Sequence, residues 1–144
     1  MMQQNNPQAM HLIIWISFLS TIAVFFFILT NQTGGFGQYA QLDHNRMLDF
    51  TNEFAITCYV IGALMYVGHS IVPKLVRSPE RSPVGLIVKL AMLESMALFG
   101  FVLAKNLQDG QAAIPFFALA AVGMIRACPL FKMERPQRPG TPIT

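Results

Sequence analysis

The sequence predicts an all-α integral membrane protein with four transmembrane helices in an antiparallel up-down arrangement. Hydrophobic residues make up 53% of its 144 residues and charged residues only 12%, and the mean hydropathy is +0.47. In ordinary soluble domains about 25% of residues are charged. Four apolar segments approach or exceed the roughly 20 residues that cross a hydrocarbon core of about 30 Å. The lipid bilayer is therefore the expected surroundings of this chain.

The first apolar segment, 11–30, contains no Asp, Glu, Lys or Arg. A secretory signal has a positively charged start, a shorter apolar stretch and a small-residue cleavage site, whereas residues 1–10 contain no Lys or Arg. We therefore expect a retained transmembrane helix. The connection 31–51 opens with Thr-Gly-Gly-Phe-Gly, which favours turns, and is expected outside the cytoplasm. Its second half, 39–50, allows a short amphipathic helix on the membrane surface, although the apolar set for one is thin: Leu42, Met47, Leu48 and Phe50.

The second helix is predicted over about 52–76. Thr51 or Asn52 suits the N-cap, and Glu53 lies in the first turn, where the helix dipole favours an anion. Pro73 is expected to bend or end the helix. The short polar turn that follows makes the second and third helices an antiparallel hairpin.

Three residues of the second helix, Gly62, Tyr66 and His69, recur at spacings that place them on one face. We expect this face to lie against the third helix. Two interpretations of His69 remain open: a neutral histidine that is hydrogen-bonded near the membrane interface, and a proton relay. Two interpretations of Tyr66 also remain open: a residue that packs between helices and a residue that helps to bind an ion.

The third helix, predicted over about 83–105 with Ser82 as N-cap and Pro83 in its first turn, carries Glu94 near its middle. An ionisable group at that depth costs about 2.5 to 3.5 kcal/mol on insertion scales and is a functional-site hypothesis by default. Counting from the turn places Glu94 level with Tyr66. Small residues on this helix and the preceding one suit close helix packing: Gly62, Ala97, Gly100 and Ala104.

The fourth helix is predicted over about 111–128, after a tight turn at Asp109-Gly110, with Pro115 near its start. It completes a single membrane domain, 1–128. The remaining residues, 129–144, are rich in proline and predict an irregular cytoplasmic tail.

Lysine and arginine are distributed unevenly between the two expected sides of the membrane. The positive-inside rule places the richer side in the cytoplasm, together with both termini. We expect a bacterial inner membrane. The richer side carries Lys74, Arg77, Arg81, Arg126, Lys132, Arg135 and Arg138, and the other carries Arg46 and Lys105.

Motifs for catalysis are missing from the sequence: no nucleophile–base constellation, phosphate-binding loop or cofactor site is recognisable. We expect no enzyme activity, no cofactor and no metal. No basic run interleaved with aromatics predicts nucleic-acid binding, and Cys58 and Cys128 lie in or at the end of apolar segments, as small buried hydrophobes do. In the loop, Asp43, His44, Arg46 and Asp49 fit either a metal site or a solvated face, and we favour the latter.

In the hairpin, the turn Arg77-Ser-Pro-Glu80 precedes a helix that reads Leu90-Ala-Met-Leu-Glu94-Ser-Met-Ala-Leu-Phe-Gly. This run resembles the c subunit, or proteolipid, of rotary F-type ATP synthases, in which an Arg-Gln-Pro turn precedes a mid-membrane Glu and a pattern such as Ile-Tyr-Gly. The resemblance covers about 54–105 and implies that Glu94 binds the transported proton or sodium ion, with Phe99 in place of the tyrosine.

The chain also differs from that family. Serine replaces the glutamine of the turn, Glu94 follows the turn sooner by about one helical turn, and only Gly62 and Gly68 stand where the family has a repeated glycine motif. The first and fourth helices have no counterpart in a two-helix c subunit.

Two functions therefore remain open. The first is a small, non-catalytic accessory or structural subunit of a larger membrane complex, with Glu94 in a helix–helix contact. The alternative is a proteolipid-like subunit that translocates protons or sodium, for which Glu94, Tyr66 and His69 are the ion-binding candidates. The first predicts other membrane subunits as partners, and the second allows a homo-oligomer. We favour the accessory subunit.

Overall fold

Four long helices dominate the computed structural model, which describes residues 7–75 and 83–132. They are α1 (Pro7–Gln32), α3 (Glu53–Leu75), α4 (Val84–Leu107) and α5 (Ile114–Ala127). The shorter elements are η1 (Phe36–Tyr39), α2 (His44–Met47), η2 (Gly110–Ala113) and η3 (Pro129–Lys132). The described ranges contain no strand. Four segments are long and apolar enough to cross a membrane: Gln8–Gln32, Glu53–Leu75, Val84–Leu107 and Gly110–Ala127. The prediction of an all-helical chain with four such helices is confirmed.

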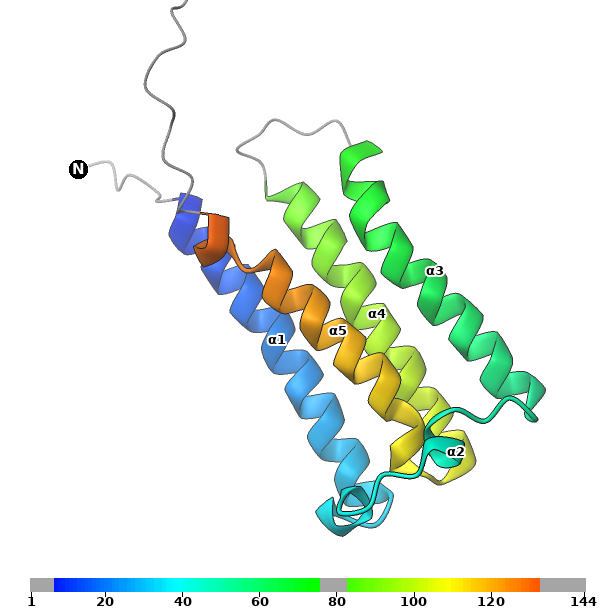
Figure 1. Cartoon of the computed structure of the whole chain (residues 1–144). Coiled ribbons are helices and arrows are strands. Elements are labelled where there is room, and N and C mark those ends of the chain that lie inside the picture. Colours follow the sequence, from blue (N-terminus) through cyan, green and yellow to red (C-terminus); the bar gives the residue numbers. More distant parts are fainter. Residues whose placement is uncertain (1–6, 76–82, 133–144) are drawn as a thin grey trace, which may run out of the picture.

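The central helix is α4, which packs against α1, α3 and α5. In Figure 1, α1 and α3 flank α4 on opposite sides, and α5 lies in front of it between them. Seven residues of α4 are buried: Leu90, Leu93, Met96, Ala97, Gly100, Leu103 and Ala104. The helix α4 is therefore the common neighbour of the other three long helices.

Contacts between α1 and α5 are spaced along both helices. The indole Nε1 of Trp15 donates a hydrogen bond to the carbonyl of Met124 at 2.7 Å. Further along α1, the ring of Phe26 meets that of Phe117, closer to the start of α5, edge to face at 5.4 Å. Aromatic groups thus hold α1 to the rest of the molecule at two levels.

The ring of Phe116 fills the space where α3, α4 and α5 meet. A Cβ atom added at Gly62 would lie 2.6 Å from the ring, and one added at Gly100 would lie 2.5 Å from the Phe116 Cβ. Both glycines therefore permit a close approach that no larger residue allows without movement. A second close approach joins α4 to α5, where Leu93 lies over Gly123.

The helix ends agree with the sequence in part. Asn52 is the N-cap of α3, because its Oδ1 accepts hydrogen bonds from the backbone N–H of Phe54 at 2.9 Å and of Ala55 at 3.3 Å. Pro83 directly precedes α4, and the predicted cap Ser82 lies outside the described residues. Pro73 lies inside α3. The fourth helix starts at Ile114 instead of 111, because Gly110–Ala113 form a 3₁₀ turn.

The first residues of the tail that was predicted to be irregular form a 3₁₀ helix: Pro129–Lys132 are η3, which packs against α1. The rest of the tail, 133–144, and the basic turn 76–82 lie outside the described residues. At the opposite end of the molecule, the segment 33–52 between α1 and α3 crosses the ends of α4 and α5 (Figure 1). We call this segment the end loop.

Candidate functional site

Glu94 lies on the side of α4 that points away from α3. Its side chain is partly exposed, and no hydrogen bond or ion pair joins its carboxyl to any residue of 7–75 or 83–132. Met92 marks the α3-facing side of α4, since a Cβ at Gly68 of α3 would touch its methyl group at 2.5 Å. At 100° per residue, Glu94 is about 200° around the helix from Met92.

The neighbouring helix on the Glu94 side is α1. Phe101, two turns after Glu94 on nearly the same face, packs against Phe25 of α1 with ring centroids 5.9 Å apart. Ser95, which follows Glu94 in the chain, donates a hydrogen bond from its hydroxyl to the carbonyl of Ala91 at 2.8 Å. Glu94 therefore lies at the outer edge of the α1–α4 contact, where its carboxyl can be reached from outside the molecule.

The two other ion-binding candidates lie on α3. His69 is only 6% exposed; its Nδ1 is hydrogen-bonded to the carbonyl of Tyr66, and its Nε2 lies 3.3 Å from the hydroxyl of Ser70. The rings of His69 and Tyr66 are 4.9 Å apart. These bonds stay within α3, and Glu94 is directed away from that helix. The structure thus brings Tyr66 and His69 together and leaves Glu94 apart from them.

All four residues singled out for helix packing are buried. Ala97 and Ala104 are fully buried in α4, and Gly62 and Gly100 receive the ring of Phe116. The small residues are therefore used for packing within this chain. In the described structure the outer side of α4 instead carries larger apolar residues such as Leu98 and Val102.

A second polar centre, which the sequence did not reveal, lies where the end loop crosses η2, directly before α5. The side chain of Gln111 is fully buried. Its Nε2 donates to the carbonyls of Gln38 at 2.6 Å and Gln41 at 2.9 Å, and its Oε1 accepts from the backbone N–H of Asp43 at 2.9 Å. One amide group thus satisfies three backbone groups of the loop.

Gln38 completes this arrangement from the loop side. Its Oε1 accepts from the backbone N–H of Gly110 at 3.0 Å, and its Nε2 donates to the Thr33 hydroxyl at 2.9 Å. A Cβ atom at Gly110 would lie 2.5 Å from the Gln38 oxygen. A larger residue at this position would therefore require the Gln38 side chain to shift.

An ion pair ties the loop to the turn between α4 and α5. The Arg46 guanidinium donates to both carboxylate oxygens of Asp109, through Nε at 2.7 Å and Nη2 at 2.9 Å. The hydrogen bond to Asp109, followed by its charge, raises the pKa of Arg46. Asp109 also accepts from the backbone N–H of Gln111 at 3.0 Å and so begins η2.

Tyr59 of α3 fixes the last part of the loop. Its hydroxyl donates to the carbonyl of Met47 at 3.2 Å and accepts from the backbone N–H of Asp49 at 3.1 Å. The carboxylate of Asp49 accepts from the Thr51 hydroxyl at 2.6 Å and from the Thr51 backbone N–H at 2.9 Å. These two bonds, the hydroxyl first, lower the pKa of Asp49 below its ordinary value.

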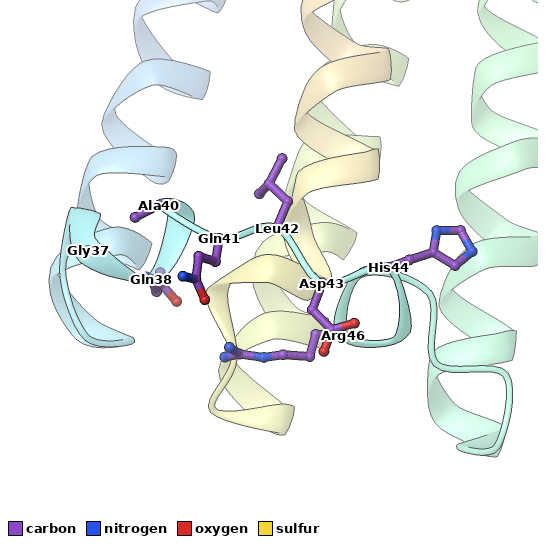
Figure 2. A pocket seen from close by; sticks show the side chains of 8 residues that line it. All are labelled: Gly37, Gln38, Ala40, Gln41, Leu42, Asp43, His44 and Arg46. Atoms are coloured by element: carbon purple, nitrogen blue, oxygen red, sulfur yellow. The ribbon is translucent and has the colours of Figure 1, made fainter.

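An open pocket of about 540 Å³ lies along the loop between Gly37 and Arg46 (Figure 2). The two acidic side chains considered for a metal have other partners: Asp43 begins α2 by accepting from the Asn45 N–H at 2.9 Å, and Asp49 accepts from the Thr51 hydroxyl. No group of three or more potential metal ligands occurs among the described residues. The polar groups of this loop hold the loop itself in place.

A signal for Gln111 does exist in the sequence. Asp109-Gly110-Gln111 is a polar run directly before an apolar segment that starts Ala-Ala-Ile-Pro-Phe-Phe. An amide at the start of such a helix needs a hydrogen-bond partner when it is buried. The partners were not predictable, because they are backbone groups about 70 residues earlier in the chain.

Comparisons with protein-family descriptions, curated proteins and solved structures find no match to this chain.

Proposed function

We propose that this protein is a non-catalytic integral membrane protein and serves as an accessory or structural subunit of a larger membrane complex. Four helices with the length and composition of membrane spans support the membrane assignment. In this proposal they cross the bilayer alternately up and down, with lipid around their exposed apolar sides.

The proposed orientation places both termini and the turn 76–82 in the cytoplasm and the end loop outside, in a bacterial inner membrane. It rests on the excess of Lys and Arg at one end. Single cysteines at Gln41, Ser78 and Thr141 test it with an impermeant thiol reagent on intact cells. Only Gln41→Cys should be labelled, and the unsubstituted chain is the blank because Cys58 and Cys128 are buried. Labelling at Ser78 but not at Gln41 would reverse the orientation.

The observation that carries the proposed role is the unpaired carboxyl of Glu94 at the outer edge of α4. A polar group left without partners in hydrocarbon is costly, and ionisable residues in membrane helices usually face protein. The described part of this chain supplies no partner for Glu94. A hydrogen-bond donor or a cation from another membrane subunit would satisfy the carboxyl, and the large apolar residues beside it would complete that contact.

The composition and stoichiometry of the native complex, purified in mild detergent, test this role. We expect one or two copies of this chain beside larger subunits. Glu94→Leu should weaken co-purification because the partner group is left unsatisfied, whereas Glu94→Gln keeps much of the hydrogen-bonding capacity. Ser95→Ala is the matched control, since that hydroxyl is bonded within α4. Co-purification that withstands Glu94→Leu would count against a contact through this carboxyl.

A second function, ion translocation by a proteolipid-like subunit, is favoured by the same partly exposed position of Glu94. A carrier carboxyl must be reachable from outside its own helices in order to exchange an ion. Release of a proton also needs a nearby cation, and the four long helices have Lys and Arg only toward their ends: Lys74, Lys89, Lys105 and Arg126. The cation would therefore come from another subunit.

The two functions differ in how they respond to Glu94→Gln. Glutamine cannot titrate, so an ion carrier would lose transport and keep its assembly, whereas an accessory subunit would keep both. Labelling with a hydrophobic carbodiimide is an independent measurement, with Glu53 at the start of α3 as the comparison carboxyl. A symmetric ring of this chain with transport lost in Glu94→Gln would replace the accessory function by the carrier.

A further inference from the structure

The end loop is held against the ends of the helices at three places along its length. Gln111 binds the backbone of Gln38, Gln41 and Asp43, Arg46 pairs with Asp109, and Tyr59 binds Met47 and Asp49. With these bonds formed, the loop cannot project far from the helices. Its side chains therefore lie at the level where the apolar segments end.

Three large apolar side chains of the same loop are nevertheless exposed. Phe36 and Leu42 are each 60% exposed and Phe50 is 64% exposed. By contrast, Met47 and Leu48, between them, are partly buried. Exposing the large side chains to water forgoes about 25 cal/mol for each Å² that burial would remove. A loop tied down so fully would be expected to bury them unless its surroundings are apolar.

The direction of the side chains separates the loop into two sides. In Figure 2, Leu42 points back along the helices, whereas Gln41 points away from them. On the α3 side, the ring of Phe50 lies tilted beside that of Tyr59, with centroids 5.7 Å apart, and Phe54, the second residue of α3, is exposed as well. The exposed apolar side chains of the loop thus continue the exposed apolar surface of the helices.

We propose that Phe36, Leu42 and Phe50 insert into the lipid at the membrane interface, so that the end loop lies on the bilayer surface. This inference rests on the proposed membrane location. The three side chains would contact the acyl-chain region just below the headgroups, because they are apolar and the one loop cation, Arg46, is already paired with Asp109. Aromatic and aliphatic side chains at this depth anchor a protein by buried apolar area.

Tryptophan fluorescence in reconstituted liposomes tests the insertion. In a Trp15→Phe background, single variants Leu42→Trp and Phe50→Trp are compared with Gln41→Trp, on the polar side of the loop. Phospholipids brominated near the headgroup should quench the first two strongly and shift their emission to shorter wavelength, while aqueous iodide should quench only Gln41→Trp. Gln41 and Leu42 are drawn in Figure 2.

A further variant, Leu64→Trp, separates this inference from the proposed function. Leu64 is 66% exposed on α3, far from the loop, so brominated lipid should quench it in any membrane-embedded protein. If brominated lipid quenches Leu64→Trp but not Leu42→Trp and Phe50→Trp, the loop is not inserted in the lipid. This conclusion holds both if aqueous iodide reaches Leu42→Trp and Phe50→Trp and if another chain covers them. A failure at Leu64 itself would overturn the membrane location.

Discussion

Gln111 and Glu94 are both polar side chains in apolar helical segments, and their surroundings differ. The Gln111 amide is fully buried and makes three hydrogen bonds to the end loop. The Glu94 carboxyl is partly exposed and has no partner in the described part of the chain. A polar group whose bonds are all made internally is expected to support the fold, whereas one that is left unpaired at the surface is available to another molecule.

The largest expected effect is at Gln111. Gln111→Leu keeps a similar volume but leaves two carbonyls and one N–H of the loop without partners. Since an unsatisfied buried group costs about 1–3 kcal/mol, we expect a loss of about 3 kcal/mol in the free energy of unfolding, with partial rehydration of the loop. Unfolding in mixed micelles, followed by Trp15 fluorescence, measures it.

Gln32→Leu is the control for this change, because Gln32 is exposed at the end of α1. Its free energy of unfolding should stay close to that of the unsubstituted chain. Equal stability of Gln111→Leu and Gln32→Leu would remove the distinction between the two kinds of polar residue.

The same contrast between a closed and an open position exists for two glycines of α4. Gly100→Ala places a Cβ 2.5 Å from the Phe116 Cβ, whereas nothing lies within 4 Å of a Cβ at Gly85. Overpacking of this kind costs about 1–3 kcal/mol, so Gly100→Ala should lower the free energy of unfolding by about 2 kcal/mol. Gly85→Ala should leave it unchanged or slightly raised. Similar values for the two variants would mean that Phe116 moves aside freely.

A smaller, pH-dependent effect is expected at Asp49. Its pKa is held below the ordinary value of 3.8, so the carboxylate stabilises the folded loop above pH 3.8, and this contribution is lost as the pH falls through the lower folded-state pKa. Asp49→Asn should remove that part of the acid dependence, and Thr51→Val should reduce it. The free energy of unfolding, measured across this pH range, tests the prediction. If its decrease at low pH were the same in Asp49→Asn as in the unsubstituted chain, the bonds to Thr51 would not persist in solution.

The smallest effect on the isolated chain is expected at Glu94. Neither Glu94→Gln nor Glu94→Leu removes a described interaction, so both should unfold within about 0.5 kcal/mol of the unsubstituted protein, as surface substitutions usually do. A loss comparable to that of Gln111→Leu would reveal a partner within the chain. Such a result would also contradict the proposal that Glu94 binds a group of another subunit.

The apolar segments and their limits follow from local sequence. The four helices occur in the order predicted, since a segment of apolar residues about 20 long can satisfy its backbone in lipid only as a helix. Their limits differ in part: α1 is longer than predicted, Pro7–Gln32, and α5 is shorter, Ile114–Ala127. Asn52 begins α3 as predicted because a cap depends on neighbouring residues. The function of Glu94, the orientation and the resemblance to proteolipids stay predictions.

The rotation of each helix about its axis was decided by tertiary packing. The sequence identified Glu94, Tyr66 and His69 but not the rotation of α4, which turns Met92 toward α3 and leaves Glu94 outside. Nor did it identify Gln111, since the bonds of this amide reach across about 70 residues. Apolar helices present similar surfaces on every side, so their rotation is set by which side chains interlock, here Phe116 between Gly62 and Gly100.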